Sequence, residues 1–210
     1  PTAAKQPILR EIRNIVTIPG MATMLAVQFL IQFSMMIIAP LLPIYIPVLA
    51  PDLTYVASAA GAIIAAAGLT SAVASAAMGK ISERLNHRTI LASAAALSAV
   101  CFAAQAAAGS VLVFGSMRAV SGLFLGAMLP TVNAIAYYLI PEAKRGVAFG
   151  ITTTSMQMGI VIGPVSGGAL AVYFGIPAVF WLSALLFAAV AVGALLARTL
   201  PDGGQSKPCP

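Results

Sequence analysis

The chain has 210 residues, of which 60% are hydrophobic and only 8% charged, with a formal net charge of +6. Soluble domains carry about 25% charged residues, so this composition excludes a water-soluble domain and indicates an integral membrane protein. The basic residues are spread singly or in pairs over short loops, which excludes a nucleic-acid interface. The two cysteines, Cys101 and Cys209, predict neither a disulfide framework nor a metal site, and we expect no cofactor.

Charges and turn residues divide the chain into six apolar segments. A span needs about 20 apolar residues, because the hydrocarbon core is about 30 Å thick and a helix rises about 1.5 Å per residue. The predicted spans cover residues 21–48, 55–78, 89–108, 111–140, 147–173 and 178–197. A cytoplasmic linker or interfacial segment is expected over 1–20, including a short surface helix over 8–18, and a cytoplasmic tail over 198–210. The fold class is therefore all-α, with six transmembrane helices.

Basic residues occur at both ends of the chain and in every second connection between the spans. They are Lys5, Arg10, Arg13, Lys80, Arg84, Arg88, Lys144, Arg145, Arg198 and Lys207. Because cytoplasmic loops of membrane proteins carry an excess of Lys and Arg, both termini are predicted to be cytoplasmic. We expect a multi-pass protein of the plasma (inner) membrane.

The connection between the second and third spans, GKISERLNHR, combines a glycine with charges of both signs. The residues of interest are Gly79, Lys80, Glu83, Arg84 and Arg88. Gly79 allows close backbone approach, and the carboxylate and guanidinium can pair with each other or with neighbouring helix ends. The alternative is a solvated basic loop that only sets orientation.

One cation, Arg118, falls inside the fourth span, followed by Gly122 and Gly126. Arg118 lies roughly 10 Å deep, and a charge within the membrane indicates a functional residue. The alternative is that its side chain reaches outward or caps a carbonyl group as part of packing. The two glycines favour close approach of another helix. No Asp or Glu lies in any predicted span, so these helices hold no carboxylate that could carry a proton.

The fifth span contains the run GIVIGPVSGG. Its helix-breaking residues are Gly159, Gly163, Pro164, Gly167 and Gly168. In a soluble helix each interior glycine costs about 1 kcal/mol and an interior proline about 3 kcal/mol. A bilayer enforces the helix, so the glycines at intervals of four predict a smooth stripe for a close neighbour. Pro164 removes one backbone donor and predicts a bend.

Several amide, aromatic and methionine side chains in the spans are candidates to line a substrate cavity. They are Gln28, Gln32, Met36, Asn133, Tyr137, Met156 and Gln157. Such a surface suits amphipathic drugs. The alternative is that these residues only pack and form interhelical hydrogen bonds, each contributing about 0.6 kcal/mol on average.

These motifs together resemble the major facilitator superfamily. GKISERLNHR is similar to the family's G-x-L-x-D-R-x-G-R-R loop, from which it departs at Glu83, Asn86 and His87. RAVSGLFLGAMLP resembles the R-x-x-x-G signature of a fourth helix, and GIVIGPVSGG resembles the fifth-helix signature of the drug/proton antiporter branch. The resemblance implies that the loop is a charge latch between conformations and that Arg118 serves coupling or structure.

The resemblance also implies an architecture and a function. The chain is expected to be the C-terminal six-helix half of a multidrug efflux transporter that works by proton-coupled alternating access. Its partners are then the lipid bilayer, an N-terminal six-helix half or a second copy, a small amphipathic substrate and protons. An enzyme is not expected, since no span carries a metal-binding set or a Ser–His or Ser–Lys pair. The alternatives are a non-transporting accessory protein and a facilitator of sugars or metabolites.

Overall fold

The computed structural model describes residues 8–81 and 86–196, and every regular element in these ranges is a helix. Glu83, Arg84 and the tail over 198–210 lie outside the described residues, as do the side chains of Gly79 and Lys80. The elements are α1 (Ile8–Val16), α2 (Met21–Met36), the 3-10 turn η1 (Ala39–Leu41), α3 (Leu42–Leu49), α4 (Val56–Ile81), α5 (His87–Ala106), α6 (Val111–Leu139), the 3-10 turn η2 (Glu142–Lys144), α7 (Arg145–Phe174) and α8 (Ile176–Leu196). Six segments are long and apolar enough to cross a membrane, so the predicted all-α fold with six spans is confirmed.

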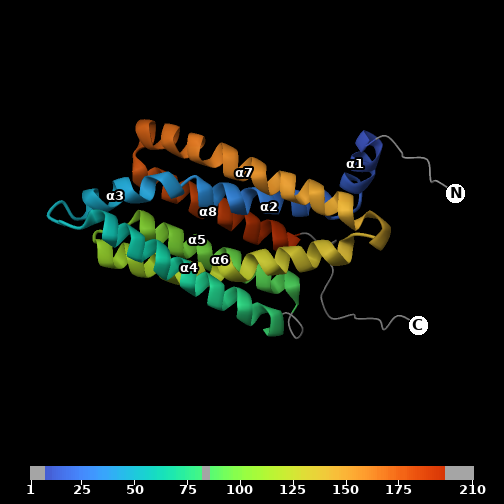
Figure 1. Cartoon of the computed structure of the whole chain (residues 1–210), viewed down its shortest axis with the longest axis horizontal. Helices are drawn as coiled ribbons and strands as arrows, with labels where there is room; N and C mark the ends of the chain where they lie inside the picture. Colours follow the sequence, from blue (N-terminus) through green and yellow to red (C-terminus); the bar gives the residue numbers. More distant parts are fainter. Residues whose placement is uncertain (1–7, 82–85, 197–210) are drawn as a thin grey trace.

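The spans run back and forth along one long axis (Figure 1). The surface helix α1 and the turn between α6 and α7 lie at one end of the molecule, and the loop over 51–55 lies at the other. The most extensive helix pairs are α4 with α6, α5 with α8, α5 with α6, and α2 with α7. Successive connections therefore emerge at alternating ends, as the alternation of basic loops in the sequence requires.

The first span is interrupted near its middle. It is one segment by length and composition, Met21–Leu49, but its helix breaks after Met36 and restarts through η1 into α3. Pro40 and Pro43 occupy the first turns of η1 and α3, and Pro47 lies inside α3. Proline lacks a backbone N–H and is tolerated best in the first turn of a helix, which explains why the restarts fall at these residues.

An aromatic cluster forms the core where α3, α5, α6 and α8 meet. Phe102 and Phe187 stack with ring centroids 5.1 Å apart, and Phe114 meets Phe180 edge to face at 5.5 Å. Tyr45 of α3 packs against both Phe114 and Phe180. Aromatic pairs add about 0.5–1.5 kcal/mol to the burial of their area. This cluster fixes α5 and α8 at the back of the bundle.

The helices α4 and α7 are the least covered. Only 6% of the apolar window of α4 and 17% of that of α7 is buried, compared with 39–56% in the other spans. In Figure 1 they form opposite edges of the bundle, with α7 at the top and α4 at the bottom. Each packs mainly on one neighbour, α4 on α6 and α7 on α2.

Among the described side chains of α1, Ile15 anchors the helix. Ile15 is buried in a small cluster with Met21, Ala136, Ile140 and Ala148. The expected surface helix over 8–18 is thus present as α1, and it covers the end of α6 and the start of α7.

Candidate functional site

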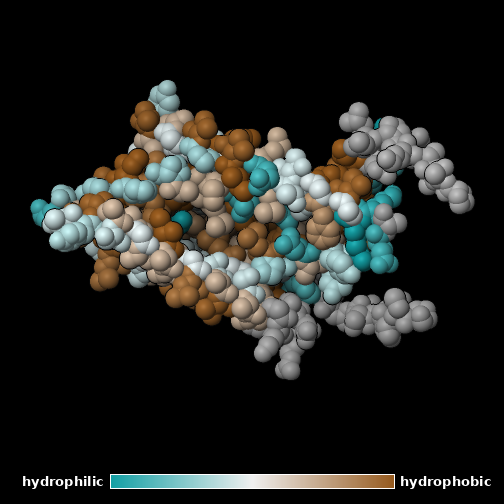
Figure 2. Space-filling view, viewed as in Figure 1, coloured by the Kyte–Doolittle hydropathy of each residue, from teal (hydrophilic) through white to brown (hydrophobic). Residues whose placement is uncertain are grey.

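An open face lies between the edge helices α4 and α7, where α2 and α6 are uncovered. Figure 2 shows this face hollowed along its middle, with hydrophilic atoms inside the hollow and hydrophobic atoms on its flanks. Ligand sites of this kind are concave and mostly apolar, with a few polar groups that orient the ligand.

An amide pair joins α2 and α6 on the open face, with Gln28 buried and Asn133 exposed. Gln28 of α2 is 1% exposed, and its Nε2 donates to Oδ1 of Asn133 on α6 at 3.1 Å. The Oε1 of Gln28 is buried and has no hydrogen-bond partner among the described residues. Gln32, one turn along α2, is also buried, and Met36 is half-buried. The structure therefore joins two of the predicted lining residues and leaves one buried acceptor available.

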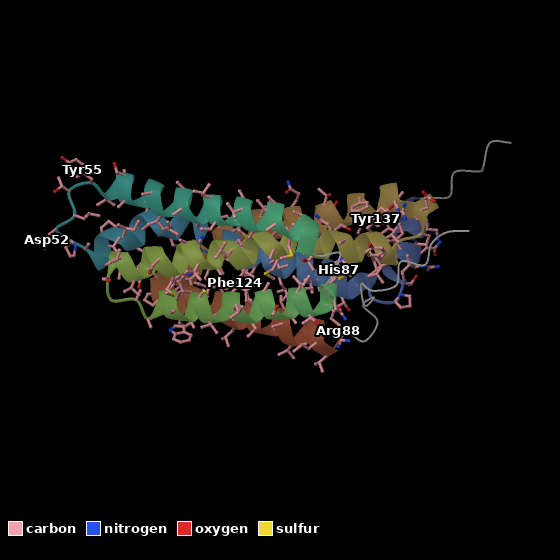
Figure 3. All side chains as sticks on the ribbon, turned by 90° about the horizontal axis from the view of Figure 1, so that it is seen from below. Asp52, Tyr55, His87, Arg88, Phe124 and Tyr137 are labelled. Carbon is pink, nitrogen blue, oxygen red and sulfur yellow. The ribbon has the colours of Figure 1, made fainter. Side chains whose placement is uncertain are left out.

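The other predicted lining residues lie apart from this pair. Tyr137 is 46% exposed, and the guanidinium carbon of Arg145 lies 3.9 Å from its ring centroid. Figure 3 shows Tyr137 near the end of the bundle, well away from Asp52 and Tyr55. On α7, Met156 is half-buried, and Gln157 borders a shallow surface groove of about 240 Å³ with Thr154 and Val161.

Arg118 of α6 sits against the aromatic core. Its guanidinium carbon lies 5.6 Å from the ring centroid of Phe102, and its Nη1 is buried with no hydrogen-bond partner in the described part of the chain. Ser98 and Gln105 lie about one turn on either side of Phe102 on α5 and are fully buried. Their Oγ and Oε1 atoms also lack described partners. Sequence analysis did not select these two residues, although polar side chains seven positions apart in an apolar helix mark one face of it.

The glycines of α6 lie directly against the backbone of α4. A Cβ added to Gly126 would lie 2.7 Å from the Cα of Ser71, and one added to Gly122 would overlap Thr70 and the carbonyl of Ala67. The Oγ1 of Thr70 also donates to the carbonyl oxygen of Ala119 at 2.7 Å. Thr70 is a contact that the sequence did not reveal, since threonine often bonds within its own helix.

The glycines of α7 lie against α2 in the same way. A Cβ on Gly159 would lie 2.8 Å from the carbonyl oxygen of Phe29, and one on Gly163 would lie 2.8 Å from Cβ of Met36. A Cβ on Gly167 would overlap the carbonyl of Ile37, whereas one on Gly168 would meet nothing within 4 Å. The helix continues through Pro164.

The start of α5 is tied to its neighbours. Asn86 caps the helix by accepting from the backbone N–H of Arg88 at 2.9 Å. The Nε of Arg88 donates to the carbonyl oxygen of Ala194, near the end of α8, at 2.8 Å. His87 is buried and meets Tyr138 edge to face at 5.8 Å. Of the five residues of interest in the loop, Gly79, Lys80, Glu83, Arg84 and Arg88, the structure thus describes the side chain of Arg88 alone.

Within the described ranges, no group of three or more His, Cys, Asp or Glu side chains is placed to hold a metal ion. The polar contact that the structure describes between α2 and α6 is that of the Gln28 and Asn133 amides.

Comparison with known proteins identifies the family. The sequence model of the Major Facilitator Superfamily matches residues 24–208. The multi-drug resistance efflux pump PmrA of Streptococcus pneumoniae is 32% identical over 163 residues, which cover 77% of this chain and 40% of that protein. The multidrug resistance protein MdtG of Enterobacter lignolyticus is 29% identical over 203 residues, which cover 95% of this chain and 49% of that protein. The chain thus spans about half or less of the length of these curated relatives.

A solved structure shares the fold. The crystal structure of the POT family transporter PepTSo superposes with a TM-score of 0.79 at 16% identity, covering 91% of this chain and 39% of that one. At this identity the likeness concerns the fold alone. Together with the family match over most of the chain, it confirms the resemblance predicted from the motifs: this multi-pass membrane protein belongs to the Major Facilitator Superfamily.

Proposed function

We propose that the chain is the second six-helix half of a secondary transporter that exports small amphipathic molecules by alternating access. The relatives PmrA and MdtG are named as a multi-drug resistance efflux pump and a multidrug resistance protein, which supports this activity over an enzymatic one. The share of those proteins that the chain covers supports a second six-helix half as its partner. We call this chain together with the half that completes it the assembled transporter.

The observation that carries the proposal is the open face between α4 and α7. Transporters of this architecture bind substrate near the middle of the membrane, between two halves related by a two-fold axis. The Gln28–Asn133 pair lies on such a face, and Asn133, which is exposed, presents an amide to a substrate while Gln28 holds it from behind. Apolar flanks with few amides favour breadth of recognition over tight selectivity.

The exposed sides of α4 and α7 are proposed to contact the other half. Leu69 and Val73 of α4 and Val161 and Val165 of α7 are all more than half exposed. Lipid alone is able to cover such side chains, but α4 and α7 form the two edges of the bundle, one on each side of the open face (Figure 1). A partner packed on both rims would close the hollow into a cavity.

Proton coupling is proposed to use a carboxylate of the other half. None of the six candidate spans contains Asp or Glu, and an arginine guanidinium is not deprotonated in proteins. This half would then supply substrate contacts and the rocking surface.

We further propose that both termini face the cytoplasm in the plasma membrane and that the loop over 79–88 is a latch there. The excess of Lys and Arg at that end supports the orientation. The bond from Arg88 to the carbonyl of Ala194 supports a latch that joins α5 to α8. A cysteine placed at residue 144 should react with an impermeant maleimide only from the cytoplasmic side.

Dye transport in everted membrane vesicles tests the proposed function. The assembled transporter should accumulate an amphipathic dye when the vesicle interior is acidified, and collapse of the pH gradient should abolish accumulation. Asn133→Ala should raise the dye KM, whereas Gly193→Ala, a change in open space on α8, should leave it unaltered. Dye accumulation that persists without a pH gradient would contradict the proposed proton coupling. Absence of dye accumulation under any gradient would contradict the proposed efflux.

A further inference from the structure

Gln157 of α7 carries an exposed amide to which no described residue forms a hydrogen bond. The other four amide side chains in the candidate spans differ from it, because three are buried and Asn133 bonds to Gln28. The exposed hydroxyl groups of Thr153 and Thr154 are satisfied within α7, since each donates to the carbonyl oxygen four residues earlier. Gln157 therefore keeps two donors and one acceptor available.

Gln157 lies at a depth where lipid cannot supply the missing bonds. The helix α7 has 30 residues and is about 45 Å long, and Gln157 lies about 18 Å along it from Arg145. With α7 centred on a hydrocarbon core about 30 Å thick, the amide lies about 10 Å inside the nearer edge of that core. An unbonded polar group is strongly unfavourable in hydrocarbon, where no water can satisfy it. The amide of Gln157 therefore needs a partner other than lipid chains.

The surface beside Gln157 has the shape of a receptacle for one side chain. A shallow groove of about 240 Å³ is lined by Thr154, Gln157, Met158, Val161 and Ile162, all of α7. The first four, which we call the socket, occupy positions i, i+3, i+4 and i+7. Four residues of one helix form the hole that receives a side chain of a facing helix in this way. Ligand pockets enclose most of their ligand, so a groove with a single helix as its wall favours a packed helix over a small molecule.

The socket faces away from the rest of the bundle. Val161 lies two residues before Gly163, and residues two apart point about 200° apart around a helix. Gly163 packs against α2, so the socket lies on the opposite side of α7, which forms one edge of the bundle in Figure 1. The chain spans about half or less of the length of PmrA and MdtG. A helix of the half that completes the transporter is therefore the occupant that the position and the length both favour.

We propose that a helix of the completing half packs along α7 and inserts a hydrogen-bonding side chain, an amide or a hydroxyl, into the socket. Gln157 bonds to this side chain across the boundary between the halves, and Met158 and Val161 pack around it. A single polar pair in an apolar helix contact fixes the register of the two helices, because any other register leaves both groups unbonded. The inference rests on the proposed transport function and names the chemistry of one contact between the halves.

Spin labelling of the assembled transporter in nanodiscs tests this contact. A nitroxide is attached through Gln157→Cys in a background that lacks other reactive cysteines. We expect low accessibility of the label both to molecular oxygen, which concentrates in lipid, and to a water-soluble nickel chelate. The control label is attached through Leu185→Cys on α8, where the side chain is 66% exposed, and should be readily accessible to oxygen.

Thermal unfolding of the assembled transporter separates a hydrogen bond from simple packing and needs no label. Gln157→Leu, which has a similar size but cannot bond, should lower the Tm by about 2 °C. Met158→Leu, which keeps the apolar part of the socket, is the control and should change the Tm less. An amide that faces lipid predicts the opposite sign, because Gln157→Leu would then remove an unbonded polar group from hydrocarbon.

The remaining outcomes identify other occupants. High oxygen accessibility at residue 157, or a Tm raised by Gln157→Leu, would place the amide against lipid and overturn the inference. High accessibility to the nickel chelate would place it in water or in the substrate path and overturn the inference while efflux itself stands. Spin–spin broadening that disappears on dilution with unlabelled protein would assign the socket to a second copy of this chain instead of the completing half. Failure of the unlabelled wild type to accumulate dye would overturn the efflux proposal, which the accessibility of residue 157 does not test.

Discussion

Two helix contacts in the bundle, which we call glycine seams, both place glycines against the backbone of a neighbouring helix, but the two backbones differ. On one side Gly122 and Gly126 of α6 meet α4, and on the other Gly159, Gly163 and Gly167 of α7 meet α2. The first seam joins two helices that are unbroken where they touch, although Pro130 leaves the carbonyl of Gly126 without its helical donor. The second seam lies against the end of α2, and Gly167 meets Ile37, in the break between α2 and η1. Close packing is thus common to both seams, whereas a break in a helix occurs only in the second.

This difference indicates which of the two helix contacts can shift without moving a whole helix. Residues in a regular helix move only with their neighbours, because each carbonyl is bonded to the N–H four positions later. The segment around Ile37 has lost part of that ladder, whereas the glycine-bearing helices each lack one donor, at Pro130 in α6 and at Pro164 in α7. We therefore expect the α7–α2 seam to absorb small displacements that the α6–α4 seam transmits to a whole helix.

The largest expected effect comes from Gly126→Ala. The added Cβ would lie 2.7 Å from the Cα of Ser71, and the regular α4 backbone has to move as a unit to make room. We expect the free energy of unfolding to fall by about 3 kcal/mol, the upper part of the range for overpacking. Titration of the detergent-solubilised chain with sodium dodecyl sulfate, followed by circular dichroism, measures this change.

The matched control is Gly68→Ala on α4 itself, where the new Cβ meets nothing within 4 Å. Its effect should stay within about 0.5 kcal/mol. If Gly126→Ala and Gly68→Ala unfold at the same mole fraction of sodium dodecyl sulfate, α6 and α4 are packed less closely than the structure shows.

A smaller effect is expected from Gly167→Ala on the other seam. Its Cβ would overlap the carbonyl of Ile37, but the break after α2 allows that peptide to shift. The free energy of unfolding should fall by about 1–2 kcal/mol in the same titration. Gly168→Ala, one residue further along α7 and in open space, is the control and should change the free energy of unfolding very little. A loss as large as that of Gly126→Ala would contradict the idea that the break relieves the clash.

The sequence was sufficient for the fold and for part of the candidate site. Charges and turns locate the spans because the bilayer imposes a fixed length on each apolar segment. The spacing of Gly159, Gly163 and Gly167 predicts that they share one face, but which helix lies there depends on tertiary packing. For the same reason Gln28 and Asn133 were expected separately as lining residues, 105 positions apart, and only the fold joins them.

Two features of the structure are not predicted by the sequence, each for a physical reason. The break after Met36 was not expected because the hydropathy of residues 21–48 is continuous, although the prolines beyond it carry the signal. Ser98 and Gln105 are single polar residues in an alanine-rich helix, and their importance depends on Phe102 and Arg118 beside them. The periodicity of one helix does not reveal which side chains another helix places beside it.

Each seam also contains one hydroxyl bond between helices, and the two should have equal strength. Thr70 donates to the carbonyl of Ala119 at 2.7 Å, and Ser155 donates to that of Leu25 at 2.8 Å. Thr70→Val and Ser155→Ala should each lower the free energy of unfolding by about 1 kcal/mol. Ser166→Ala, whose hydroxyl bonds within α7 to Ile162, is the control and should change little. A smaller loss for Thr70→Val would show that the hydroxyl of Thr70 divides its bond with its second acceptor, the carbonyl oxygen of Ala67 at 3.0 Å.

The smallest expected effect concerns the bond that links the two seams across the open face. Gln28 belongs to the α2–α7 pair and Asn133 to the α6–α4 pair, and their amides meet at 3.1 Å. A double-mutant cycle of Gln28→Leu and Asn133→Ala should give a coupling energy of about 0.6 kcal/mol, the average for polar pairs in membrane proteins. A parallel cycle of Gln28 with Gln157, which borders a groove lined by α7 residues and forms no hydrogen bond to Gln28, should be additive within about 0.5 kcal/mol. Zero coupling in the first cycle would mean that only the aromatic core behind the open face holds the two pairs together, so that the face is free to widen around a substrate.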